Sequence, residues 1–198
     1  EQTRAPKMGA TVMGVSARGY GQGSVSLGWQ ALAGADVYGS GISINSNPYT
    51  DTKADIDNYQ KWGDTAIGLR AVATGGNATA LGRSARAAAE NAIAIGGGNG
   101  NSFDNNTEKT EASAAKATAI GYNAKAIAGD TVALGTSSQA SGSDALAIGK
   151  NANASNSDSI AIGQDTVSNQ INSVALGKTS KATGASATAL GPQAKATG

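Results

Sequence analysis

A glycine recurs every 14 residues along most of this chain. With each such glycine counted as position zero, the step is 14 residues throughout from Gly121 to Gly191. A fixed period indicates a repeat architecture, in which each repeat cannot bury a core alone and stacks on the next. The zero positions are Gly14, Gly28, Gly68, Gly82, Gly96, Gly121, Gly135, Gly149, Gly163, Gly177 and Gly191, with Asn45 of GISIN interpreted as one more. The sequence therefore predicts twelve repeats, here termed rungs.

Within a rung the residue types alternate. Position −1 is aliphatic, −2 is nearly always Ala and −3 is often β-branched, which is the period of two that is typical of a strand. Positions +3 and +5 are small around a longer polar +4 residue, which predicts a second short strand. Asn or Asp at −5 and Gly or Asn near +7 are turn residues, expected to supply positive φ. Each rung is therefore predicted to be strand, turn, strand, turn, stacked as a parallel β-solenoid.

The small residues are expected inside the coil. Two short strands enclose a narrow space that suits Ala, and a chain with 4% aromatic residues cannot build a core of large side chains. The larger aliphatic residues then point outward and form a row, here termed the aliphatic ladder. Its members are Leu27, Ile67, Leu81, Ile95, Ile120, Val132, Leu134, Ile148, Ile160, Ile162, Val174, Leu176 and Leu190.

The aliphatic ladder predicts self-association. A monomer would expose an apolar stripe larger than soluble monomers tolerate, and full burial of each such side chain contributes about 1.5–3 kcal/mol. We therefore expect a closed homo-oligomer with the ladder at its axis. The alternative exchanges the two faces, with Ile inside and Ala outside, and would allow a monomeric solenoid.

Two insertions interrupt the repeat, near residues 34–63 and 97–113. The first carries half of the eight aromatic residues of the chain, together with several charged residues. Insertions in solenoids project as loops that often bind ligands, and aromatic residues supply much of the energy of protein interfaces. The alternative is that these residues cap or brace an imperfect rung, and that the second insertion is an exposed loop. The candidate ligand contacts here are Tyr38, Tyr49, Tyr59 and Trp62.

Basic residues recur at positions +1 and +4. Those proposed as ligand contacts are Arg86, Lys125 and Lys181, and Arg83, Lys150, Lys178 and Lys195 share the pattern. They either form a solvated face or offer a lateral surface to an extended partner such as a collagen-like protein, which repeated shallow contacts would bind by avidity.

Several function classes are excluded or disfavoured. The chain has no His and no Cys, so a hydrolase triad or a Cys–His dyad cannot form, and neither an enzyme nor a metal site nor a cofactor is expected. A net charge of +1 gives no electrostatic case for nucleic acid. No run of 18 apolar residues occurs, so no membrane contact by this chain is expected.

The rung NSVALGKTSKATG (172–184) resembles the repeat of YadA-like heads of trimeric autotransporter adhesins, as do DSIAIG (158–163) and GDTVALGTSSQASG (129–142). The resemblance implies an all-β, left-handed parallel β-roll in which three chains share the apolar axis, a homotrimer. It also implies a place at the tip of a stalk on the Gram-negative outer surface. The implied partners are host matrix proteins (collagen, fibronectin or laminin) or a host cell-surface receptor.

The whole chain, 1–198, is interpreted as one β-roll head fragment, with a neck, stalk and membrane anchor expected after residue 198. The alternative function is a structural spacer or shield that projects a different ligand-binding domain from the cell surface.

Overall fold

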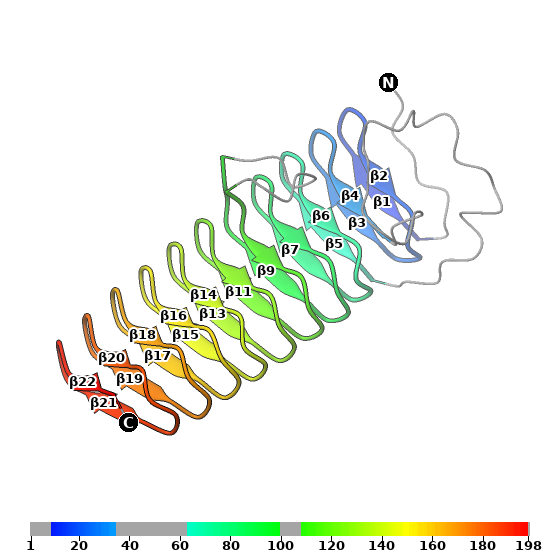
Figure 1. The fold of residues 1–198 in the computed structure, drawn as a ribbon. Helices are drawn as coiled ribbons and strands as arrows, with labels where there is room; N and C mark the ends of the chain where they lie inside the picture. Colours follow the sequence, from blue (N-terminus) through cyan, green and yellow to red (C-terminus); the bar gives the residue numbers. More distant parts are fainter. Residues whose placement is uncertain (1–8, 35–62, 100–107, 198) are drawn as a thin grey trace.

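The computed structural model describes residues 9–34, 63–99 and 108–197. These residues form 22 short strands in two parallel sheets of 11 strands each, and the described part of the chain holds no helix. Figure 1 shows the result as a rod, in which the chain advances by one rung at each turn from the N-terminal to the C-terminal end. The predicted all-β, parallel solenoid of 14-residue rungs is confirmed.

The first sheet is made of three-residue strands that precede the position-zero glycines. They are β1 (Thr11–Met13), β3 (Val25–Leu27), β5 (Thr65–Ile67), β7 (Thr79–Leu81), β9 (Ile93–Ile95), β11 (Thr118–Ile120), β13 (Val132–Leu134), β15 (Leu146–Ile148), β17 (Ile160–Ile162), β19 (Val174–Leu176) and β21 (Thr188–Leu190).

The second sheet is made of two-residue strands at positions +4 and +5. They are β2 (Arg18–Gly19), β4 (Leu32–Ala33), β6 (Val72–Ala73), β8 (Arg86–Ala87), β10 (Glu111–Ala112), β12 (Lys125–Ala126), β14 (Gln139–Ala140), β16 (Asn153–Ala154), β18 (Val167–Ser168), β20 (Lys181–Ala182) and β22 (Lys195–Ala196).

Equivalent positions of successive rungs lie side by side, and this register corrects the number of rungs. Strand β3 pairs directly with β5, with Val25 opposite Thr65 and Leu27 opposite Ile67. No rung centred on Asn45, which itself lies outside the described residues, is inserted between them. The prediction of twelve rungs is therefore wrong, because Asn45 was counted from the aliphatic pattern of GISIN, although it follows Gly28 by 17 residues and precedes Gly68 by 23. Eleven rungs are present in the described chain.

The two insertions leave the rod at opposite edges. The first departs after Gly34 and returns at Gly63, on the turn that links a second-sheet strand to the next first-sheet strand. The second departs on the other turn, after Gly97. Strand β10 lies in register between β8 and β12, so the repeat has resumed by Glu111, inside the range of 97–113 marked from the sequence.

The core is a column of alanines, as predicted. Alanines at −4, −2, +3 and +5, such as Ala145, Ala147, Ala152 and Ala154, are at most 1% exposed. Where Ser or Thr replaces Ala, its hydroxyl in most rungs donates a hydrogen bond to a nearby main-chain carbonyl, often that of the turn residue three positions earlier. Examples are Ser138 Oγ to Gly135 O (2.9 Å), Thr166 Oγ1 to Gly163 O (2.8 Å) and Ser173 Oγ to Gln170 O (2.6 Å). The buried Ser24 hydroxyl is an exception without a partner in the described chain.

Both turns of a rung contain a residue with left-handed backbone. One is position −5, as expected, for example Asp144 with φ of 58°. The other is position +2, for example Asn151 with φ of 56°, and not the predicted position near +7. At +7, Gly142 is close to the next rung and does not have a positive φ, and a Cβ on it would lie 2.0 Å from the carbonyl carbon of Asn156.

Candidate binding surfaces

The aliphatic ladder forms the outer face of the first sheet. Its side chains point away from the alanine core, and Leu81, Leu134 and Leu176 are 41%, 37% and 39% exposed. All thirteen predicted members occupy this face, in strands that pair along the rod. The alternative with Ile inside and Ala outside is therefore wrong, because the space between the two sheets admits only small side chains. The role of the ladder as a trimer interface stays a prediction.

The outer face of the second sheet carries charged or polar residues at position +4 in eight of its eleven strands, and Leu32, Val72 and Val167 in the others. Arg86 lies opposite Glu111 of the next rung, and its Nη1 atom is 2.6 Å from Glu111 Oε1. The buried Lys109 Nζ approaches the other oxygen of the same carboxylate at 3.8 Å. Arg86 is thus partly engaged within the chain. Lys125 is half-buried and Lys181 is exposed on the same face.

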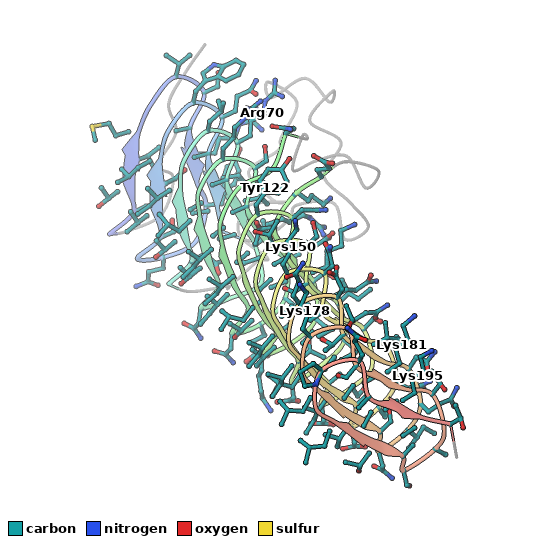
Figure 2. All side chains as sticks on the ribbon, turned by 90° about the vertical axis from the view of Figure 1, so that its left-hand side faces the viewer. Arg70, Tyr122, Lys150, Lys178, Lys181 and Lys195 are labelled. Atoms are coloured by element: carbon teal, nitrogen blue, oxygen red, sulfur yellow. The ribbon has the colours of Figure 1, made fainter. Side chains whose placement is uncertain are left out.

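Lysines gather along one flank in the C-terminal half of the rod. Lys150 and Lys178 occupy position +1 on the turn next to the second sheet, while Lys181 and Lys195 lie opposite one another in β20 and β22. Figure 2 shows these four residues following one another along the rod, on the side that also carries Arg70 and Tyr122. The structure therefore brings together basic residues that are up to 45 positions apart in the sequence.

One aspartate lies within this flank. Asp165 accepts hydrogen bonds from Asn151 Nδ2 (2.8 Å) and Gln164 Nε2 (2.9 Å). The hydrogen bond from Asn151, followed by the bond from Gln164 and the nearby charges of Lys150 and Lys178, lowers the pKa of the Asp165 carboxyl below its usual value. The carboxylate is therefore held ionised between the two lysines.

Aromatic residues also occupy position +1, and sequence reasoning did not single them out. Trp29 is exposed, and the guanidinium carbon of Arg70 lies 5.1 Å from the centre of its ring, a cation–π contact. Tyr122 donates a hydrogen bond to Glu108 Oε2 (2.5 Å), and this bond raises the pKa of the Tyr122 hydroxyl. Their shared position relative to the glycine is a signal that could have identified them.

The aromatic candidates of the first insertion are not placed by the structure. Tyr38, Tyr49, Tyr59 and Trp62 lie outside the described residues, so their role as ligand contacts stays a prediction. Of the basic candidates, Arg86, Lys125 and Lys181 share the outer face of the second sheet, although Arg86 is separated from Lys125 by the rung of Glu111.

The described rungs match a known repeat. A family model for the YadA head domain repeat, which spans two copies, matches residues 63–85, 73–99, 112–138, 126–152, 140–166, 154–180, 168–194 and 182–198. From residue 112 onward the matches begin at steps of 14 residues, and together the matches cover more than half of the chain. The chain belongs to the YadA head family. It is accordingly an adhesin-type domain of the kind found in trimeric autotransporters. No curated protein sequence matches the chain significantly.

Metal-binding clusters and membrane-spanning helices are both absent from the described residues. Within residues 9–34, 63–99 and 108–197, no group of three or more His, Cys, Asp or Glu side chains is arranged to hold a metal ion. Over the same residues, no helix has the length and apolar character needed to cross a membrane.

Proposed function

We propose that this YadA head domain is the homotrimeric head of a cell-surface adhesin, wound as a left-handed β-roll, that binds host matrix or cell-surface proteins. The observation that carries the proposal is the aliphatic ladder. It runs through ten of the eleven described rungs of the first sheet, with Met13 in the remaining one, and the positions −1 and −3 that form this face hold no charged residue in those rungs. Ten successive rungs of partly exposed Ile, Leu and Val are costly to leave in water.

Three copies around one axis would cover this face and leave the second sheet outside. The outer surface of the trimer would then be formed by the charged residues at +4, by the two turn edges and by the roots of both insertions. Such a surface offers many similar shallow contacts, which suit an extended protein ligand better than a small molecule. Collagen, fibronectin, laminin and cell-surface receptors are the partners that the family resemblance suggests.

The oligomeric state is tested first, and binding of the ligand is tested second on the same sample. Sedimentation equilibrium should give three times the chain mass of 19.3 kDa, and the same sample is then titrated onto immobilised collagen, fibronectin and laminin. Saturable binding of the trimer to one of them supports the adhesin. A stable trimer that binds no matrix protein and no host cell would favour the alternative, a spacer that projects another binding domain.

The part played by the aromatic insertion needs its own variant. Removal of residues 46–62 should leave the chain trimeric, with three times the mass of the shortened chain, because β3 and β5 already pair without that segment contributing a strand. If the deletion also leaves matrix binding unchanged, the contacts belong to the rungs, and Tyr49, Tyr59 and Trp62 are not ligand contacts.

A further inference from the structure

The net charge of the chain conceals a strong separation of charge across the rod. Residues 121–197 hold five lysines and four aspartates. Three of the aspartates, Asp130, Asp144 and Asp158, lie at position −5 on the turn edge away from the lysines, and are here termed the acidic edge. All five lysines lie on the opposite turn or on the outer face of the second sheet, together with only Asp165. They are Lys125, Lys150, Lys178, Lys181 and Lys195, here termed the lysine strip.

The lysine strip is available to a ligand. Lys150, Lys178, Lys181 and Lys195 are exposed, and none of the five forms an ion pair with another residue in the described part of the chain. By contrast, Arg86, a basic residue of an earlier rung on this face, is joined to Glu111. Lys125 lies beside Glu111 of the preceding rung. From Lys150 to Lys195 the strip therefore carries three uncompensated positive charges, four lysines against Asp165, over four successive rungs.

The spacing of the strip is set by the fold. Lys181 and Lys195 are strand neighbours, so their backbones lie about 4.8 Å apart along the rod axis. Lys178 belongs to the same rung as Lys181, and Lys150 lies two rungs before Lys178 on the same turn edge. The charges thus form two adjacent columns parallel to the axis, one at position +1 and one at position +4.

We propose that the lysine strip binds a linear sulfated polysaccharide, such as the heparin-like chains of animal cell surfaces. A flexible chain with anionic groups along its length can follow a line of lysines and release its counterions, which is the general source of affinity between polyanions and basic surfaces. The inference rests on the cell-surface placement in the proposed function, but it concerns a different ligand from the matrix proteins.

The geometry favours a polysaccharide over a nucleic acid. Proteins that bind single strands add aromatic side chains on which bases stack. Tyr122, at the N-terminal end of the strip, is the one aromatic residue beside it in the described chain and is hydrogen-bonded to Glu108, and residues 150–195 hold no aromatic residue. Proteins that bind duplexes usually insert an element into a groove, whereas the strip lies on a straight, shallow wall. Contacts between ammonium groups and sulfates need neither feature.

The test compares two triple variants with the same change of charge. The first, Lys178→Gln/Lys181→Gln/Lys195→Gln, removes three charges from the strip. The control, Asn77→Asp/Asn91→Asp/Asn172→Asp, adds three negative charges at position −5, where three other rungs already carry Asp with the same backbone conformation. Both should unfold at the temperature of the parent chain and keep its sedimentation coefficient.

Fluorescence anisotropy with a labelled heparin decasaccharide gives the affinity at several salt concentrations. We expect the parent chain and the control to bind with similar affinity, and the lysine variant to bind at least about tenfold more weakly, with a shallower dependence on salt. Fully desulfated heparin should not bind. The inference fails if the parent does not bind heparin, if both triples lose affinity equally, or if desulfated heparin or a DNA duplex binds as tightly. None of these outcomes bears on trimer formation or on matrix-protein binding.

Discussion

At the scale of single residues, the fold depends on what each position can accommodate. Interior alanines were predicted correctly, because a rung of two short strands leaves room for a methyl group and little else. The left-handed residue at +2 was missed, because Ser16, Gln30, Arg70 and Thr179 share no chemical character at that position. The left-handed backbone at +2 follows the stacked position-zero glycine and occurs with many residue types. The residue type at +2 therefore does not predict this conformation.

Position zero should accept only glycine. Gly149 has φ of 124°, and a Cβ there would lie 2.4 Å from the carbonyl oxygen of Gly163. We expect Gly149→Ala to lower the free energy of unfolding by roughly 2 kcal/mol or more, because backbone strain and overlap with main-chain atoms add together. Urea unfolding followed by circular dichroism measures the change. In the preceding rung, Ser137→Gly should change stability little, since the left-handed φ of 55° at Ser137 suits glycine. Similar losses for both variants would contradict this account.

The pKa of Asp165 gives a second test at this scale. Its hydrogen bonds and neighbouring lysines hold the folded pKa below the unfolded one. The stabilising effect of the carboxylate is therefore fully present above the unfolded pKa, and is lost as the pH falls through the lower folded value. Asn151→Ala should raise the pKa, measured by NMR titration of the Asp165 carboxyl carbon. Asn153→Ala serves as the control, because Asn153 lies in β16 and donates no hydrogen bond to Asp165. This variant should leave the pKa of Asp165 unchanged.

At the scale of the element, the unit of structure is the rung and not the strand. The 14-residue period, the strand positions and the inward faces could all be read from the sequence, because each is repeated many times. The interrupted rungs were harder. Thr110 stands at position +3, where other rungs often have Ala, and Glu111 stands at +4, where Arg86 and Lys125 lie in the neighbouring rungs. For this reason the sequence did not show where the repeat resumes after the second insertion. At Asn45, the aliphatic pattern suggested a rung where the register allows none.

Removal of one full period should be tolerated. Deletion of residues 136–149 joins Gly135 to Lys150 and keeps every later residue at its position relative to glycine. We expect the same circular dichroism spectrum and cooperative unfolding at slightly lower stability, since a solenoid is a sum of rungs and their interfaces. Deletion of residues 136–142 removes half a period, so that polar turn residues would fall at positions that form strands in the other rungs. Its unfolding should become broader and begin at clearly lower urea, and equal behaviour of the two deletions would refute the rung as the unit.

At the scale of the whole molecule, the two sheets have different tasks. The outward aliphatic ladder was predicted from the sequence, because it follows from the narrow interior. The lysine strip was predicted only in part. The sequence shows that basic residues recur at +1 and +4, but its net charge of +1 gives no sign that positive and negative side chains lie on different sides of the rod. That separation appears only when residues many positions apart are stacked.

The ladder can be disrupted without disturbing the coil. Ile148→Glu/Ile162→Glu places two charges on the outer face of the first sheet, where side chains are half-exposed in a single chain. We expect each rung to remain folded while the assembly dissociates, with sedimentation giving the monomer mass and circular dichroism retaining the β-sheet spectrum. Burial of unpaired charges at the axis would cost several kcal/mol per trimer.

A matched pair on the other sheet serves as the control for this variant. Asn153→Glu/Val167→Glu introduces the same charges on neighbouring rungs at position +4. This control should stay trimeric. Loss of the trimer in both variants would show that added charge alone, and not its place on the ladder, is responsible.

The direction of the hydrogen bonds between rungs has a mechanical consequence. The bonds that join one rung to the next, such as Gly149 N to Leu134 O at 2.8 Å, run along the rod and not across it. A stretching force on the two ends would therefore open rungs in succession from an end, instead of shearing a whole sheet at once. Each opened rung would release 14 residues, about 50 Å of extended chain, so the rod would yield in steps and absorb a sudden pull.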